Sequence, residues 1–206
     1  KDWKGPAGEA IKSELASSVP GLPQAEPSLK ITYVQPKDFT GLLRYVRNIL
    51  VVTIDPTAYT KVSVGYENNV WARGQVVVSL KAPNTESIVE YSKTHEKALV
   101  DFFVKVEMNR AIEQLQKEYS MVVMDNLKSD LNVMLNAPAN FTYYKDTTDF
   151  FWSSNNANTG RMDLIVYTFP YTDPNTFTEE YLVAKRDSVL KANLPGSFPG
   201  SYMQTE

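Results

Sequence analysis

NTESIVEYSKTHEKALVDFFVKVEMNRAIEQLQKEYSMVVMDNLKSDL, residues 84–131, is the stretch of this sequence that decides the fold. Its apolar side chains recur every three to four positions, a spacing that predicts an amphipathic helix. One unbroken helix of this length would measure about 70 Å, which exceeds the width of a compact domain of this size. The stretch therefore predicts a long helical segment with breaks near Thr94 and near Ser120.

Strand patterns lie on both sides of this helical segment. Residues 49–54 form an apolar, β-branched run without polar alternation, which predicts a central strand covered on both faces. An aspartate at Val52 is then expected to cost several kcal/mol. Residues 61–66 and 75–80 predict a hairpin. Further strands are expected at residues 29–34, 133–144, 150–153 and 162–169.

Shorter helices are predicted at residues 5–18, 37–47 and 178–193. Together the patterns predict an α+β protein whose mixed, largely antiparallel sheet is covered by helices. We expect one domain of residues 1–206. The alternative is two lobes, 1–83 and 133–206, joined by the helices of residues 84–132.

Composition excludes several classes of function. The formal net charge of -3 argues against a nucleic-acid partner, which calls for a basic surface. With no cysteine and a single histidine, His95, the chain has no thiol chemistry and no site built on two imidazoles. We expect no cofactor and no metal. No apolar run approaches the roughly 20 residues that span a bilayer.

Catalytic motifs are also missing, since no nucleophile elbow and no glycine-rich phosphate loop occurs. His95 could act as a general base only with an orienting carboxylate beside it, and a solvated or helix-terminal histidine is the simpler interpretation. Two pairs of carboxylates are neighbours in sequence, Asp146 with Asp149 and Glu179 with Glu180. The first pair is typical of a turn and the second of a helix start, so no catalytic residue is assigned.

Two segments combine aromatic residues with asparagine, residues 68–73 and 150–156. Such segments can bind a sugar or a peptide, and the alternative is that the aromatic residues are core and the asparagines form turns. We expect Trp152 to be a core residue, because Phe150 and Phe151 precede it in a strand pattern. Trp71 is the better candidate for ligand binding and is expected to be partly exposed. It follows a turn and is flanked by Asn69 and Arg73, which complete the candidate site.

The chain resembles one known family through several stretches: WKGPAG at residues 3–8, PGLPQ at 20–24, RNIL at 47–50, VWA at 70–72 and AKRDSVLKAN at 184–193. The segment from Tyr171 to Gly196 is the most specific. These stretches resemble a Bacteroidetes family of envelope lipoproteins described as a domain of unknown function (DUF4837). The resemblance spans essentially the whole chain.

The resemblance implies a lipid-anchored protein of the cell envelope, facing the periplasm or the cell exterior. Family members are longer, so we expect this chain to be incomplete at both ends and to have lost its N-terminal lipid anchor. We expect a non-catalytic binding or assembly module whose partner is an envelope protein or glycan. The alternative is a carboxylate-dependent hydrolase acting on envelope glycans or peptides.

Overall fold

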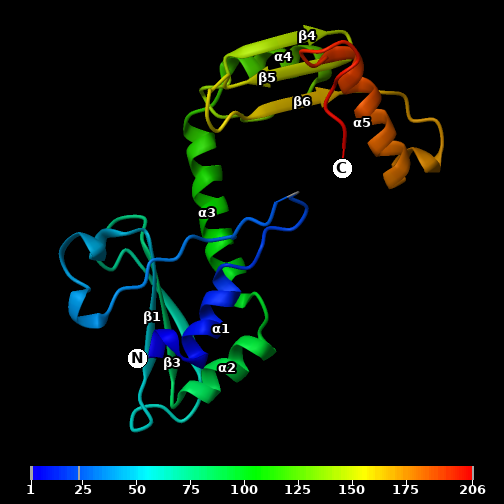
Figure 1. Ribbon diagram of the computed structural model, residues 1–206. Coiled ribbons are helices and arrows are strands. Elements are labelled where there is room, and N and C mark those ends of the chain that lie inside the picture. Colours follow the sequence, from blue (N-terminus) through cyan, green and yellow to red (C-terminus); the bar gives the residue numbers. More distant parts are fainter. Residues whose placement is uncertain (1, 23, 206) are drawn as a thin grey trace. The chain divides into compact units, whose positions relative to one another are not determined.

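The computed structural model describes residues 2–22 and 24–205. The chain divides into two compact units, Lys1–Asn109 (unit 1) and Arg110–Glu206 (unit 2). Each unit holds a three-stranded sheet, which is mixed in unit 1 and antiparallel in unit 2. Helices accompany both sheets, which confirms the predicted α+β class (Figure 1).

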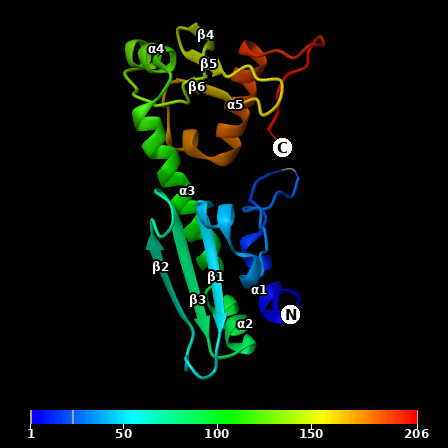
Figure 2. The same cartoon turned by 90° about the vertical axis from the view of Figure 1, so that its left-hand side faces the viewer.

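The sheet of unit 1 places β3 (Val76–Ala82) between β1 (Asn48–Ile54) and β2 (Ser63–Asn68) (Figure 2). β1 runs parallel to β3, with Leu50 opposite Val78. β2 runs antiparallel to β3, with Tyr66 opposite Val78. The predicted hairpin is therefore confirmed.

β1 is an edge strand, so the prediction that residues 49–54 form a central strand is wrong. Val51 and Val52 are 36% and 38% exposed, whereas Val78 of β3 is 2% exposed. Both strands are equally apolar in sequence, but only β3 has a paired strand on each side. The periodicity of a single strand reports how apolar its faces are and does not report its place in the sheet.

One face of this sheet packs against α1 (Pro6–Leu15), α2 (Thr85–Thr94) and the start of α3 (Ala98–Lys117). The β3 side chains on this face are buried among apolar residues of the three helices. The buried cluster comprises Ala7, Ile11, Leu15, Val76, Val78, Leu80, Ala82, Ile88, Leu99, Val100 and Phe103.

The helical stretch breaks where the sequence predicts. α2 ends at Thr94, and α4 (Met121–Leu131) begins directly after Ser120. The Oδ1 atom of Asn84 accepts a hydrogen bond from the backbone N–H of Ser87 and so caps α2 (2.9 Å). Ser120 caps α4 in the same way, because its hydroxyl oxygen accepts the backbone N–H of Val123 (3.3 Å).

A carboxylate from a distant part of the chain caps α3. Glu14 of α1 accepts the backbone N–H of Leu99 at 2.7 Å, at the start of α3. Partial burial raises the pKa of Glu14, although hydrogen bonds from the backbone of Leu99 and Val100 favour its ionised form. This contact fixes α1 against the first turn of α3.

The connection between α1 and β1 is mostly irregular. Residues 29–34 form no strand, so that prediction is wrong. The helix predicted over residues 37–47 is replaced by two short 3₁₀ helices, η2 (Pro36–Asp38) and η3 (Gly41–Tyr45). Gly41 adopts a positive φ of 54°, which a continuous right-handed helix does not allow.

Unit 2 contains the antiparallel sheet β4 (Tyr143–Thr147), β5 (Phe150–Ser154) and β6 (Asp163–Tyr167), with β5 in the centre. No strand forms over residues 133–142. The short helix η4 (Pro174–Phe177) leads into α5 (Glu179–Asn193), close to the predicted last helix.

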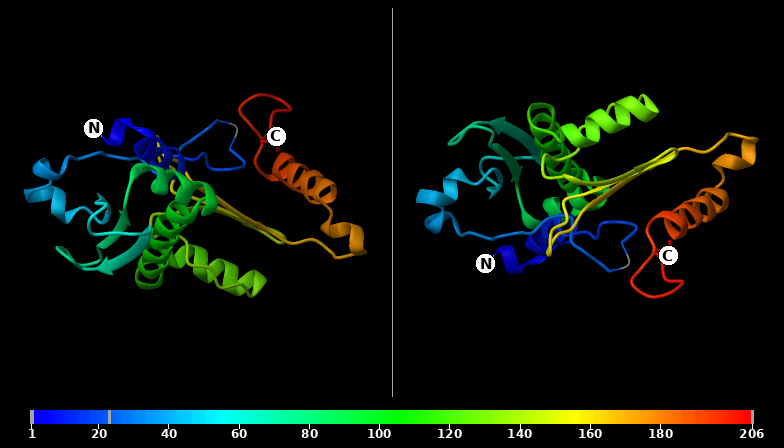
Figure 3. Two further views of the ribbon diagram at one scale, coloured as in Figure 1. Left: turned by 90° about the horizontal axis from the view of Figure 1, so that it is seen from below. Right: turned by 90° about the horizontal axis from the view of Figure 1, so that it is seen from above.

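Helices α4 and α5 lie on opposite sides of this sheet (Figure 3). On the α4 side, Val123 and Leu127 pack with Phe151, Ala137 and Phe141. On the α5 side, the Lys145 ammonium donates a hydrogen bond to the backbone carbonyl of Asn193 (2.8 Å).

The division into units falls within α3. The predicted lobes, 1–83 and 133–206, each lie inside one unit, and the intervening helices are shared between the two. One domain over residues 1–206 stays a prediction. Within residues 2–22 and 24–205, none of the helices is long and apolar enough to cross a membrane.

Candidate functional site

The loop of residues 69–74 joins β2 to β3 and has a fixed conformation. Asn69 adopts a positive φ of 59° and Gly74 a positive φ of 76°. The Asn69 Oδ1 atom accepts the backbone N–H of Gly74 at 2.6 Å, and the Asn69 backbone N–H donates to the carbonyl of Gln75 at 2.9 Å. Asparagine tolerates the left-handed conformation and bonds its own turn, so Asn69 shapes this loop.

Gln75 is the internal support of the loop. It is 1% exposed, and its side-chain amide forms three hydrogen bonds with the backbone. Oε1 accepts the backbone N–H of Trp71 at 3.0 Å, and Nε2 donates to the carbonyls of Arg44 and Val46, both at 2.7 Å. One buried side chain therefore joins the loop to the last turn of η3 and to Val46, the residue that follows it.

Trp71 is 37% exposed, as the sequence predicts. Its ring meets Phe39 edge to face, with centroids 5.5 Å apart. Such a pair fixes an aromatic ring while leaving much of its surface open.

Further apolar side chains are exposed on the same loop and on the segment that Gln75 holds against it. We call this group, together with Trp71, the Trp71 surface. Its other members are Val70 (40% exposed), Val46 (46%), Tyr45 (61%) and Leu42 (86%). Scattered single apolar residues are ordinary on a protein surface, but these five lie in two short segments, residues 42–46 and 70–71, that the buried Gln75 amide joins, so we take them as a candidate interaction surface.

Positive charge accompanies this apolar surface. Arg73 lies in the loop and Arg44 on η3, and both are exposed. Neither forms an ion pair with another residue that the structure describes. Arg47, by contrast, pairs with Glu107 of α3 at 3.0 Å. The two segments that carry the Trp71 surface therefore also carry two exposed guanidinium groups.

Of the three residues proposed from the sequence, Trp71 and Arg73 lie exposed on one loop. The Asn69 amide oxygen accepts the backbone N–H of Gly74. Its NH₂ group is the part of this amide that has no hydrogen-bond partner among the described residues. Their role in ligand binding stays a prediction. Sequence reasoning missed Gln75 and Phe39, because no local pattern links either residue to the loop.

The second aromatic and asparagine segment has a structural explanation. Trp152 is half-buried and not a core residue, so that expectation is wrong. Its Nε1–H donates to Asp163 at 3.0 Å, and the Arg161 guanidinium lies 5.9 Å from its ring. The Asn155 side chain accepts the backbone N–H of Met162 at 3.0 Å and so closes a turn. These polar side chains at the ends of β5 and β6 therefore find their hydrogen-bond partners within unit 2.

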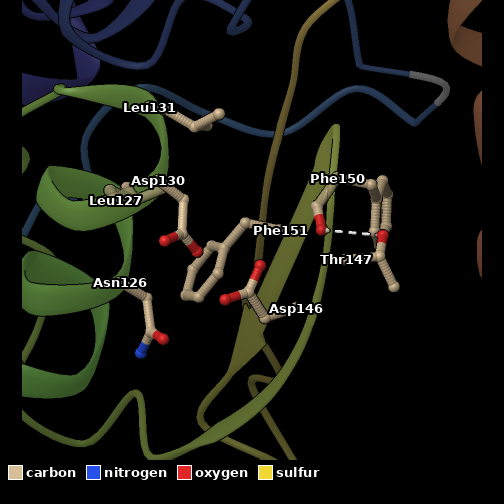
Figure 4. A pocket seen from close by; sticks show the side chains of 8 residues that line it. All are labelled: Asn126, Leu127, Asp130, Leu131, Asp146, Thr147, Phe150 and Phe151. Carbon is tan, nitrogen blue, oxygen red and sulfur yellow. Dashed lines mark hydrogen bonds between the residues drawn. The ribbon is translucent and has the colours of Figure 1, made fainter.

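A pair of carboxyl groups meets in unit 2. Asp130 at the end of α4 and Asp146 of β4 point toward one another across a shallow hollow (Figure 4). Burial, followed by the hydrogen bond and negative charge of Asp130, raises the pKa of Asp146. The hollow has an empty volume of about 170 Å³, with no space that would enclose a water molecule, and is lined by Leu127, Phe151 and other residues.

This carboxyl pair predicts a pH-dependent stability. An acid whose folded pKa is raised destabilises the fold once it ionises, so the cost is present above the raised pKa and absent below the unfolded value of 3.8. We expect Asp146→Asn to raise the melting temperature by about 1 to 3 °C at neutral pH and to leave it unchanged near pH 3. Thermal unfolding followed by circular dichroism measures this. The control Asp125→Asn on the same helix should show no gain, and an equal gain at both pH values would contradict the assignment.

The carboxylate pairs that the sequence offered are not brought together as acid and base. Asp149 accepts the hydroxyl of Thr168 at 3.2 Å, and Glu179 and Glu180 lie in the first turn of α5. His95 follows α2 as its exposed C-terminal cap and stacks on Tyr91, with ring centroids 4.2 Å apart. Among the described residues, no three acidic or imidazole side chains gather to hold a metal ion.

Comparison with known proteins agrees with the two-part organisation of the chain. Residues 120–206 match a family model described as a domain of unknown function (DUF4837), which confirms the predicted resemblance for this part. The resemblance does not extend over the whole chain as expected, because residues 1–116 match a different model. No curated protein and no solved structure matches the chain. Since the match over residues 1–116 covers more than half of the sequence, the chain belongs to the family described as a domain of unknown function (DUF8532), with a DUF4837 domain following it.

Proposed function

We propose that this protein is a non-catalytic binding or assembly module of the cell envelope, and that the Trp71 surface is its recognition site. The observation that carries the proposal is a half-exposed tryptophan on a loop braced from beneath by the buried Gln75 amide. Tryptophan and arginine dominate the energetics of binding surfaces. A loop held in one conformation loses little entropy when a ligand binds.

The chemistry of the surface defines the ligand. Trp71 and Tyr45 offer flat apolar faces, and Arg44 and Arg73 offer donors for carboxylate or phosphate groups. An acidic glycan or an acidic, aromatic segment of an envelope protein has both features. The envelope setting, the Bacteroidetes origin and attachment through an N-terminal lipid anchor are part of this proposal, and they are supported by the resemblance of residues 171–196 to envelope lipoproteins.

Fluorescence of Trp71 tests the proposal. In a Trp3→Phe, Trp152→Phe background, Trp71 is the remaining tryptophan. An oligogalacturonate and a peptide rich in glutamate and tyrosine are titrated in turn, with a neutral xylo-oligosaccharide as the uncharged probe. We expect saturable quenching by an acidic probe, no saturation with the neutral one, and weak shielding of Trp71 from acrylamide in the free protein.

Trp71→Ala should weaken binding of the acidic probe at least about 30-fold, as loss of a central aromatic anchor does. Calorimetry measures the affinity of this variant. Because Trp71 is partly exposed, its truncation should cost less stability than the roughly 3 to 5 kcal/mol of a buried tryptophan. Tyr171→Ala, which removes an aromatic side chain 62% exposed in unit 2, is the control and should bind normally. Full shielding of Trp71 from acrylamide, or binding unchanged in Trp71→Ala, would refute the proposal.

A carboxylate-dependent hydrolase is the second candidate, and the Asp130 and Asp146 pair is the observation in its favour. Two carboxyl groups that share a proton can act as acid and base. However, glycoside hydrolysis needs carboxyl groups roughly 5 to 9.5 Å apart with the scissile bond of a sugar held between them. The hollow between Asp130 and Asp146 has no space for a substrate group. Turnover of an envelope peptide that Asp146→Asn abolishes and Trp71→Ala preserves would favour the hydrolase over the binding module.

A further inference from the structure

The outer edge of β2 is open. β2 lies at one edge of its sheet (Figure 2), and all six of its residues are exposed. Among the described residues, no strand pairs with its outer side. A strand edge of this kind presents a row of backbone donors and acceptors that only another extended strand can satisfy in register.

The usual features that protect a strand edge are sparse in β2. Its register with β3 runs without interruption from Ser63 opposite Lys81 to Asn68 opposite Val76, so there is no bulge. It contains no proline, and Glu67 is its single charged residue. At its centre, a Cβ atom added to Gly65 would meet nothing within 4 Å. The edge is free of bulges and accessible.

The two faces of β2 differ in chemistry. On the helix side, Val64 is 40% exposed and Tyr66 is 60% exposed, and the Tyr66 ring lies 5.1 Å from that of Phe102. On the opposite side, Ser63, Gly65 and Glu67 line a polar groove of about 240 Å³ together with Ser79 and Lys81. A strand added to this edge must therefore be apolar on one face and polar on the other.

β2 itself has this alternation, and it is complementary to its own sequence. In an antiparallel pair related by a two-fold axis at Gly65, Val64 of one copy lies opposite Tyr66 of the other, twice. Aromatic residues opposite β-branched residues are a favourable cross-strand pair. On the polar face Ser63 lies opposite Glu67, and two glycines meet at the axis without steric conflict.

Charge fits the same register. Glu67 of one copy faces Ser63 of the other, and two lysines flank that serine. Lys81 is paired with Ser63 across the sheet, and Lys61 precedes Ser63 by two positions on an exposed bend. Each Glu67 carboxylate thus meets a positive environment, and no two like charges are directly opposed.

We propose that β2 is a dimerisation strand that joins two copies of this chain, edge to edge and antiparallel, into one continuous sheet. The pairing buries Val64 and Tyr66 of both copies and satisfies the open backbone edge of each. Isologous pairing closes after two copies and leaves no further β2 edge, so the assembly ends at a dimer.

Charge reversal tests this register on the full chain by sedimentation equilibrium. Glu67→Lys places a lysine against Lys61 and Lys81 of the other copy, and Lys61→Glu/Lys81→Glu places two glutamates against Glu67. We expect each variant alone to raise the dimer dissociation constant at least about tenfold, since every reversed contact occurs twice. An equimolar mixture of the two variants has opposite charges at both contacts and should recover the wild-type dissociation constant to within about threefold.

Recovery in the mixture shows that both variants are folded, and circular dichroism checks each alone. If the double variant does not fold, Lys61→Glu alone replaces it. Hydrogen exchange locates the interface, because amides of residues 63–68 should gain protection as the protein concentration rises. A wild-type chain that stays monomeric at submillimolar concentration, a mixture that fails to recover the dimer, or protection confined to another segment would each overturn the proposal.

Discussion

Replacement of Val78 with aspartate is expected to unfold unit 1. Val78 is 2% exposed at the centre of β3, between Leu50 of β1 and Tyr66 of β2. The helices that cover this face surround Val78 with apolar residues, so a carboxylate there would be removed from water. The cost of such a buried charge is at least about 5 kcal/mol, which is comparable to the whole stability of a small domain, roughly 5 to 15 kcal/mol.

Val52→Asp is the matched control for this variant. Val52 faces the same side of the sheet but is 38% exposed on the edge strand β1. Its carboxylate can reach water, so we expect a loss of about 1 to 2 kcal/mol and a folded protein. Urea unfolding of both variants, followed by circular dichroism, compares the two. A Val78→Asp chain as stable as Val52→Asp would contradict the assignment of β3 as the central strand.

These two valines also show what the sequence could and could not predict about the sheet. The apolar runs of β1 and β3 identify both as strands, because a buried sheet needs apolar residues on its faces. Strand order depends on which segments pair in the fold, and β1 pairs directly with β3, although β2 lies between the two in the sequence. No feature of residues 49–54 encodes that pairing, so the run by itself does not distinguish an edge strand from a central one.

The helices were predicted more closely, since their signals are local. Asn84 and Ser120 are capping residues that lie directly before apolar periodicity, and each accepts a backbone N–H of the helix that follows. The irregular segment between α1 and β1 behaves differently. Residues 29–34 alternate like a strand, but they pair with no strand that the structure describes, so the alternation alone does not make them one.

The same distinction applies to the candidate sites. Exposure of Trp71 follows from its position after a turn, which is a local signal. The support from Gln75 depends on carbonyl groups about 30 positions away, at Arg44 and Val46. The meeting of Asp130 with Asp146 likewise depends on how α4 packs against the β4–β5–β6 sheet. Contacts of this kind arise from tertiary packing and leave no pattern in a single sequence.

Gln75→Ala is expected to loosen the Trp71 surface and to destabilise unit 1. The substitution leaves the Trp71 N–H and two carbonyl groups without their partner, and a buried polar group without a hydrogen bond costs about 1 to 3 kcal/mol. Water can reach part of the loop after the change, so we expect a total loss of about 3 kcal/mol. The loop then no longer holds Trp71 in one orientation, and the acidic probe should bind at least about tenfold more weakly.

Urea unfolding and acrylamide quenching in the single-tryptophan background separate the two effects of this variant. The free energy of unfolding should fall, and Trp71 should become more accessible to acrylamide even under conditions where the protein is folded. Gln35→Ala is the control, because Gln35 is exposed in the same unit and its side chain makes no capping hydrogen bond. The control should change neither quantity. If Gln75→Ala unfolds with the wild-type free energy and leaves the quenching of Trp71 unchanged, the buried amide is not what fixes the loop, and the recognition surface must be stabilised in another way.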